Sequence, residues 1–314
     1  LPFHIVSLQY GLLSTRGIIK IQTLSYLIFR SFLSITAWLP LSVLNLMGEA
    51  WGYLLYHLPN RSRSTTDKNL RTCFPEKTES EITQLTKCSL VNTARTALEM
   101  GKTWLPPMEK SLSMVAECRG KELIIEAQNS GRGIILLAPH LGNWEIFGFY
   151  MCHGLDSTWL YQRPNLPALD RLITRTRSRS GIKMVPANHS GVSKVLKSLK
   201  QGKIVGVLPD QVPPEGGGTF APFYTEQALT MTLVSKLLRK TDAKVFCGFA
   251  KRLSKNKGYQ IIVEAADKQI YSENIDESVA ALNRTVENSV NKAVEQYQWE
   301  YKRFRKRPDG KKFY

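Results

Sequence analysis

The chain has 314 residues, 43% of them apolar, which is enough for one large hydrophobic core or two small domains and excludes disorder as a general description. Its five cysteines include no C-x-x-C pair, which argues against a disulfide framework and a structural zinc site and favours a reducing environment. The formal net charge of +17 predicts an acidic partner: nucleic acid, anionic lipid, a phosphorylated substrate or an acidic protein.

The first predicted element is an apolar run from Leu24 to Met47, followed by a cluster of aromatic residues. The run is long enough to span a bilayer, but Arg30 and Pro40 interrupt it, so a helix lying in the membrane interface is an open alternative. A buried helix covering the rest of the protein is a third. No small-residue cleavage site follows the run, which argues against a removed signal peptide. We expect residues 1–60 to form an N-terminal, membrane-anchoring helical segment.

A long helix is predicted from Thr78 to Leu105, within a helical region covering residues 61–115. Thr78 and Glu81 have the spacing of a capping box, and apolar residues recur behind them with an approximate helical period. This region is expected to contribute packing rather than chemistry.

From residue 134 onward, predicted strands and helices alternate. Alternation of this kind predicts an α/β fold with a central, mostly parallel sheet flanked by helices, here over residues 116–314 of a domain that covers 61–314. The first round has strands at 134–138, 157–162, 182–185 and 204–208 and helices at 144–152, 166–179 and 190–200. The second round has a helix at 226–240, strands at 243–250 and 258–265, and a closing helix at 276–304.

The candidate active site begins where the first of these strands ends. Open α/β sheets bind ligands at the carboxyl ends of their strands, and His140 follows such an end directly. A helix starting near Asn143 would bring Glu145 back toward the imidazole, so that its carboxylate holds one ring nitrogen protonated and leaves the other as a base. The alternative is a core histidine that is hydrogen-bonded to a nearby carboxylate. Asn143, beside this pair, is a candidate for contact with substrate or an oxyanion.

Basic and acidic residues after the next strands complete the candidate site. Arg163 and Arg177 are predicted to reach it as phosphate clamps or oxyanion donors, because a guanidinium presents a rigid fork of donors. A solvated helix face is the alternative for the row Arg171, Arg175, Arg177 and Arg179. Asp210, after the strand at 204–208, is expected to fix one of these arginines, with a simple turn aspartate as the alternative.

Two further features carry weaker expectations. Glycines 216–218 have the flexibility of a lid or of a loop that approaches a ligand. His153, His189 and Asp156 have spacings that match no metal-site motif, so no metal is predicted.

The segment from His140 to Glu145 resembles the His-x4-Asp/Glu signature of glycerolipid and lipid A acyltransferases. One such pair carries little weight, but further blocks resemble, in order, the late (secondary) acyltransferases of lipid A biosynthesis. Near the third block the chain departs from that pattern, because Pro213–Glu215 intervenes. The blocks lie between about residues 115 and 305 and are Arg119–Gly120, Gly131–Gly133, Tyr161–Asn165, Leu208–Gln211, Ala221–Tyr224 and Glu295–Phe304.

The resemblance implies a fold similar to that of glycerol-phosphate acyltransferases, with His140 and Glu145 as the catalytic residues and no cofactor or metal. It implies transfer of a lauroyl- or myristoyl-class chain from an acyl carrier protein thioester to a hydroxyl of a 3-hydroxyacyl chain on a phosphorylated lipid A precursor. The implied location is the cytoplasmic face of the bacterial inner membrane. Acidic acyl carrier protein and a bis-phosphorylated lipid would both suit a charge of +17.

Two other function classes stay open at this point. The first is a phospholipid or glycolipid acyltransferase, or an acyl-thioester hydrolase, that uses the same dyad; the block from Trp299 to Phe304 favours the lipid A branch. The second is nucleic-acid binding, suggested by seven Lys or Arg among residues 302–312. Nucleic acid is not predicted as a partner, because it explains neither the apolar N-terminal run nor the His140 segment.

Overall fold

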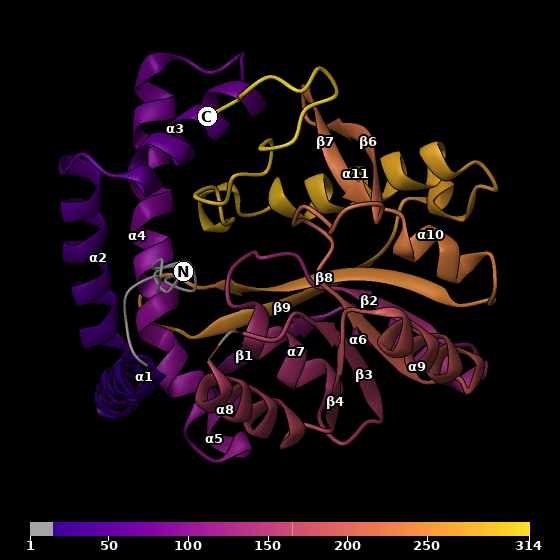
Figure 1. The fold of residues 1–314 in the computed structure, drawn as a ribbon, viewed down its shortest axis with the longest axis horizontal. Coiled ribbons are helices and arrows are strands. Elements are labelled where there is room, and N and C mark those ends of the chain that lie inside the picture. The colour runs from indigo at the N-terminus through magenta and orange to yellow at the C-terminus, as the bar shows by residue number, and fades with distance from the viewer. Residues whose placement is uncertain (1–14, 165) are drawn as a thin grey trace.

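A seven-stranded sheet runs through the middle of the molecule, with helices on both of its faces (Figure 1). The computed structural model describes residues 15–164 and 166–314, so residues 1–14 of the predicted N-terminal segment and Asn165 lie outside the described residues. The predicted α/β fold with a mostly parallel central sheet is confirmed.

The strand order of the sheet is β1-β9-β8-β2-β5-β3-β4. The five strands from β8 to β4 are mutually parallel, whereas β9 pairs antiparallel with β8 and carries β1 parallel to itself at the edge. Strand β2 therefore lies between β8 and β5, with parallel neighbours on both sides. The strands are β1 (Val115–Arg119), β2 (Ile134–Leu137), β3 (Ser157–Tyr161), β4 (Ile182–Pro186), β5 (Ile204–Val207), β8 (Lys244–Arg252) and β9 (Tyr259–Ala265).

Every residue of β2 is buried, because helices cover both faces of the sheet. Ile134 and Leu136 point into one apolar cluster, and Ile135 and Leu137 point into the other, as the two-residue period of a strand requires. On the first face lie α4 (Glu79–Trp104), α5 (Met108–Leu112), α6 (Lys121–Asn129), α7 (Trp144–Cys152) and α8 (Pro167–Ser178). On the second face lie α9 (His189–Lys200), α10 (Leu233–Leu238), the 3-10 turn η2 (Lys268–Tyr271) and α11 (Ile275–Val290).

Two predicted elements in the C-terminal half are wrong. The segment predicted as a helix over 226–240 forms strand β7 (Glu226–Met231) and then the short α10, because β7 pairs antiparallel with β6 (Gly218–Phe223) in a separate hairpin. The predicted closing helix over 276–304 ends with α11 at Val290. After it the chain forms the short 3-10 turn η3 (Val294–Gln296) and then packs irregularly against α3 (Arg61–Cys73), where it makes hydrogen bonds to Asn69.

The predicted N-terminal apolar run forms two helices, α1 (Thr15–Trp38) and α2 (Leu41–His57), which meet at Pro40. Both pack against α4, and α2 lies at the outer edge of the molecule (Figure 1). Over the described residues 15–164 and 166–314, none of the helices combines the length and apolarity needed to cross a membrane. Helix α4 begins with the predicted capping box of Thr78 and Glu81.

Candidate active site

His140 and Asp210 meet at the carboxyl ends of neighbouring parallel strands. Leu137 of β2 is in register with Val207 of β5, and each of the two polar residues lies three positions beyond its strand. The Asp210 carboxylate accepts the Nδ1–H of the imidazole at 2.9 Å and the main-chain N–H of His140 at 2.8 Å. Two hydrogen bonds to one carboxylate fix both the backbone and the ring of His140.

The hydrogen bonds of the imidazole define its tautomer. A carboxylate only accepts, so Nδ1 carries the proton and Nε2 has the free lone pair. The amide of Gln211 donates to Nε2 at 3.2 Å. The Trp144 ring lies beside the imidazole, with 4.9 Å between ring centroids. His140 thus presents Nε2 as a base whose lone pair is covered by an amide that an incoming hydroxyl must displace.

Asp210 is buried, yet its pKa is lowered. Burial raises the pKa of this carboxyl, but the electrostatic interaction with the His140 ring and the two hydrogen bonds from that residue outweigh burial. The carboxyl is therefore ionised at neutral pH. An ionised Asp210 stabilises an imidazolium that forms when Nε2 takes a proton.

Glu145 makes no hydrogen bond to the His140 ring, contrary to the prediction, because Asp210 and Gln211 occupy both ring nitrogens. Its carboxylate forms a bidentate ion pair with Arg177 of α8, through Nε at 3.1 Å and through Nη2. Asp210 holds the ring nitrogen that Glu145 was expected to hold. The expectation that Asp210 fixes an arginine is wrong for the same reason, since both its oxygens serve His140. The site has two pairs of charged or polar side chains in place of one dyad.

Asn143 is fully buried between the two pairs, where it caps α7. Its oxygen accepts the Ile146 N–H at 3.1 Å, and its amide donates to the hydroxyls of Thr103 and Tyr259 at 3.2 and 3.1 Å. Each polar atom of the side chain is used within the protein, so the expected contact of Asn143 with substrate or an oxyanion does not fit this geometry.

The other predicted arginines belong to neither of these two pairs. Arg163 is exposed, and its side chain has no hydrogen bond or ion pair with residues 15–164 or 166–314. Arg171 and Arg175 are exposed on α8, the arrangement of a solvated helix face. Arg179 donates to the carbonyl groups of Trp104 and Pro106.

The C-terminal segment closes over the main chain of the His140 loop. The N–H of Gln298 donates to the His140 carbonyl, and the N–H of Gly142 donates to the Gln296 carbonyl, both at 3.0 Å. Gln211 and Gln296 were not predicted as site residues. The available signal for Gln211 was its position directly after Asp210, and the signal for Gln296 was its place in the block Glu295–Phe304.

The site combines a base that is paired with a buried carboxylate, at the edge of an α/β sheet, with a bidentate Glu–Arg pair beside it. This combination is suited to transfer a group to a hydroxyl. Residues 17–306 match the family described as bacterial lipid A biosynthesis acyltransferase. The chain belongs to this family and is therefore an acyltransferase.

Three curated relatives from Escherichia coli (strain K12) are similar to this chain. A lipid A biosynthesis lauroyltransferase is 28% identical over 273 residues, which is 87% of this chain and 88% of the relative. A lipid A biosynthesis palmitoleoyltransferase is 26% identical over 275 residues, again 87% and 88% of the two chains. A lipid A biosynthesis myristoyltransferase is 24% identical over 254 residues, covering 81% of this chain and 78% of the relative.

Proposed function

We propose that this acyltransferase moves a fatty acyl chain of the lauroyl or myristoyl class from an acyl carrier protein thioester to a hydroxyl of a 3-hydroxyacyl chain on a phosphorylated lipid A precursor, in lipopolysaccharide biosynthesis. The observation that carries the proposal is the Asp210-bound imidazole of His140 beside the Glu145–Arg177 pair. Nε2 of His140 takes the proton of the acceptor hydroxyl while its oxygen attacks the thioester carbonyl carbon. The C–S bond then breaks, and the leaving thiolate receives that proton from His140.

Arg177 is the proposed donor to the developing oxyanion. Two of its nitrogens are bonded to Glu145, which orients the guanidinium, while its Nη1 has only a 4.0 Å contact to the sulfur of Met184 among the described residues. A preorganised cationic donor in a partly buried site stabilises negative charge more strongly than the same donor in water. Glu145 is then important for catalysis because it orients Arg177.

A small apolar crevice of about 10 Å³ next to this pair, which its side chains must widen to admit a chain, is the proposed entry of the acyl group. It is lined by apolar side chains of α7, β3, β4 and the end of β5, together with Glu145 and Arg177. Methylene groups are favourably transferred from water to such surroundings, which supports a fatty acyl donor. The apolar lining residues are Trp144, Gly148, Phe149, Trp159, Ile182 and Leu208.

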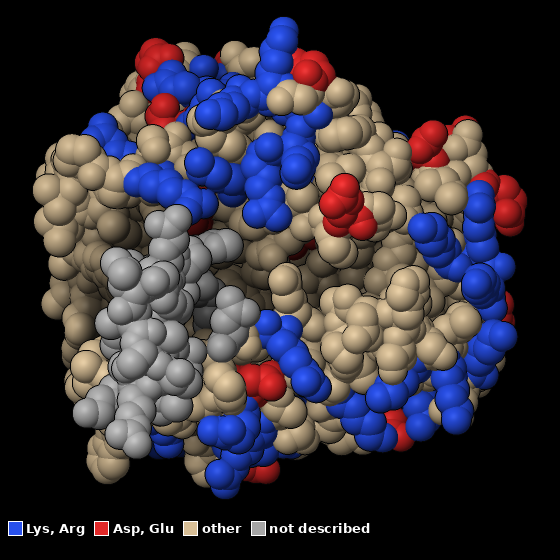
Figure 2. Space-filling view, viewed as in Figure 1, with Lys and Arg blue, Asp and Glu red and all other residues tan. Residues whose placement is uncertain are grey.

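The surface charge supports acidic partners. Lys and Arg side chains gather at the top of the view in Figure 2, over α3 and the C-terminal segment, and again along its lower right edge, around a hollow in this face. Acyl carrier protein and the phosphates of the lipid are the partners we propose for this surface. Exposed basic residues of α3 and the C-terminal segment are Arg61, Lys68, Arg71, Arg305, Lys306, Lys311 and Lys312.

The outer face of α1 and α2 is the proposed seat on the cytoplasmic face of the inner membrane. Large apolar side chains on these two helices are exposed, Trp38 to 88% and Leu46 to 68%, which is unusual for a surface that faces water alone. Helices with an exposed apolar face and aromatic residues bind in the plane of the interface. The exposed apolar residues include Leu24, Leu27, Ile28, Ile35, Trp38, Leu46, Trp51, Tyr53 and Leu54.

Mass spectrometry of the lipid product tests the proposed reaction. The protein is incubated with mixed dodecanoyl, tetradecanoyl and hexadecanoyl thioesters of acyl carrier protein and a tetra-acylated, bis-phosphorylated precursor, with a glycerophospholipid as competing acceptor. We expect one new acyl ester on a secondary hydroxyl of the precursor, and none with His140→Ala. Release of free fatty acid alone would identify a hydrolase, and acylated glycerophospholipid would identify the phospholipid branch.

Arg163 is the proposed clamp for an acceptor phosphate, because it is exposed just beyond the end of β3 and no described residue holds its charge. Arg163→Lys keeps the charge but loses the guanidinium fork, so we expect a slower transfer with the phosphorylated acceptor only. Arg171→Ala, on the solvated face of α8, is the control. An equal loss with phosphorylated and dephosphorylated acceptors would exclude the phosphate role.

A further inference from the structure

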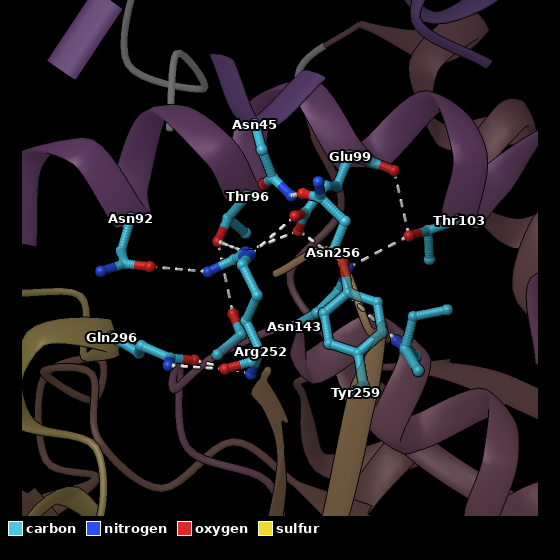
Figure 3. Close-up of polar contacts among 12 residues, drawn as sticks. Asn45, Asn92, Thr96, Glu99, Thr103, Asn143, Arg252, Asn256, Tyr259 and Gln296 are labelled. Atoms are coloured by element: carbon cyan, nitrogen blue, oxygen red, sulfur yellow. Dashed lines mark hydrogen bonds and ion pairs between the residues drawn. The ribbon is translucent and has the colours of Figure 1, made fainter. Parts of the chain in front are cut away.

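A buried ionic cluster outside the two catalytic pairs joins α4 to the strands beneath it (Figure 3). Arg252, the last residue of β8, donates to Glu99 of α4 from Nε at 2.6 Å and from Nη2 at 2.5 Å. Tyr259, the first residue of β9, donates its hydroxyl to Glu99 at 2.5 Å. All three side chains are buried. A desolvated ion pair contributes little net stability compared with apolar residues of the same volume, so stability alone does not explain it.

Further hydrogen bonds fix the cluster in place. Nη1 of Arg252 donates to Asn92 and Nη2 donates to Thr96 as well as to Glu99, and these three residues lie on one face of α4. The main chain of Arg252 exchanges two hydrogen bonds with the side-chain amide of Gln296, at 2.8 and 3.1 Å. Burial and the charge of Glu99 raise the pKa of Tyr259 well above its usual value, so the phenol keeps its proton and donates.

From this cluster a chain of hydrogen bonds leads to the loop between His140 and Glu145. The Tyr259 hydroxyl accepts from the amide of Asn143, whose oxygen caps the first turn of α7. The main-chain N–H of Asn143 donates to the Ala250 carbonyl at 3.0 Å, two residues before Arg252. Gly142 has a φ of +60°, and a Cβ there would lie 2.0 Å from the same carbonyl oxygen. The loop is thus built tightly onto β8.

We propose that Arg252, Glu99 and Tyr259 are positioning residues that hold the loop 141–143, and through it set the separation of His140 from the Glu145–Arg177 pair. The inference rests on the proposed function for the roles of those two pairs. A misplacement of about 1 Å between reacting groups lowers a rate on the order of a hundredfold, so a rigid support for this loop has a direct effect on turnover. The three residues form no hydrogen bond or ion pair with either catalytic pair and act through Asn143.

Tyr259→Phe tests the proposal because it removes one hydroxyl and leaves each neighbour with another partner. Glu99 keeps both bonds from Arg252, and the Asn143 amide keeps Thr103. We expect kcat to fall about tenfold, with KM for thioester and lipid changed less than about twofold, since only the geometry of the reacting groups is altered. Asn143→Asp keeps the helix cap but replaces the donating amide. The double variant Tyr259→Phe/Asn143→Asp should therefore have the same kcat as Asn143→Asp alone.

Ser278→Ala is the matched control. Its hydroxyl is as deeply buried, on the opposite face of the sheet, and bonds to Ser235 at 2.8 Å and to the Ile270 carbonyl at 2.6 Å. We expect it to lower the thermal midpoint about as much as Tyr259→Phe, with unchanged kcat. Equal effects of the two variants on kcat, or additive losses in Tyr259→Phe/Asn143→Asp, would overturn the proposal.

Amide hydrogen exchange separates this proposal from the proposed function. In Tyr259→Phe we expect faster exchange over residues 142–147 than in the wild type, with no change in that segment for Ser278→Ala. If residues 142–147 of Tyr259→Phe exchange at the same rate as in the wild type, the positioning role is overturned. Absence of acyl transfer by the wild-type protein would instead refute the proposed function and leave the exchange measurement valid.

Discussion

At the scale of single residues, the site consists of two bonded pairs, His140 with Asp210 and Glu145 with Arg177. Partners that act as one unit lose activity together, so a double substitution within a pair should cost no more than the worse single one. We expect His140→Ala and Asp210→Asn/His140→Ala to lose the same factor in kcat, on the order of a thousandfold. The measurement is a double-mutant cycle on acyl transfer for each pair.

Substitutions taken across the two pairs provide the contrast. Glu145→Ala combined with His140→Ala should lower kcat more than either alone, because the two side chains are hydrogen-bonded to different partners, Arg177 and Asp210. A cycle in which His140 and Glu145 behave as one unit, while His140 and Asp210 do not, would contradict the assignment.

The lowered pKa of Asp210 predicts how its contribution to stability varies with pH. In the unfolded chain the carboxyl has its ordinary pKa of 3.8, whereas in the folded chain its pKa is lower. The stabilisation is therefore complete above about pH 3.8 and is lost as the pH falls through the folded pKa. In urea unfolding from pH 3 to 7, we expect the free-energy difference between wild type and Asp210→Asn to shrink at the acid end. A difference that stays constant with pH would show that the carboxyl is not perturbed.

The sequence placed His140 and Asp210 at the same edge of the sheet, but it did not pair them. Their contact depends on β2 and β5 being neighbours in register, although the two residues are 70 positions apart. Chain proximity favoured Glu145 instead, five positions from His140. The orientation of that carboxylate follows from its ion pair with Arg177 of α8, and no local pattern contains this information.

At the scale of elements, the local periodicity of apolar residues was sufficient to predict those helices and strands that bury a regular apolar face. The strands from β2 to β5 and the helices between them fall at their predicted positions. It failed for Glu226–Met231, which is a strand because it finds a partner in Gly218–Phe223. Pairing with the adjacent strand of the hairpin outweighs helix propensity there. It failed again beyond Val290, where Trp299 and Phe304 are buried against α3 and the hairpin without helical spacing.

The close contact between α2 and α4 gives a prediction at this scale. Gly52 lies so near α4 that a Cβ would be 2.3 Å from the Cα of Val91. Helix propensity alone would make Gly52→Ala stabilising by about 1 kcal/mol, whereas the contact predicts a net loss of about 2 kcal/mol. Ser42→Ala, at an exposed position of α2, should change the free energy of unfolding by less than about 0.5 kcal/mol. Chemical denaturation measures both, and a more stable Gly52→Ala would show that the helices are further apart.

At the scale of the whole molecule, the exposed face of α1 and α2 predicts how the protein meets lipid. Replacing Leu27, Trp38 and Leu46 together by Gln removes apolar area from this face without touching the core. We expect the variant to be released from anionic vesicles after a high-salt wash and to lose activity on lipid in vesicles, while its activity on detergent-dispersed lipid is kept. Flotation and product assays measure these effects.

Ile125→Gln provides the comparison for that variant, because Ile125 is a similarly exposed apolar residue on α6, away from the two N-terminal helices. It should remain bound to vesicles and active on them. Equal release of both variants would show that general surface hydrophobicity, rather than this face, holds the protein on lipid.

The His140 loop donates one main-chain hydrogen bond to Gln296 and accepts another from Gln298, which has a consequence for the timing of synthesis. Every residue of the two catalytic pairs has left the ribosome before the chain reaches residue 296, yet the loop that carries the base still lacks its last two main-chain partners. A nascent chain therefore cannot hold the geometry of the finished enzyme. Activity therefore requires synthesis of the chain beyond residue 298, and a shorter product that meets an acyl thioester or lipid has no formed site with which to act on it.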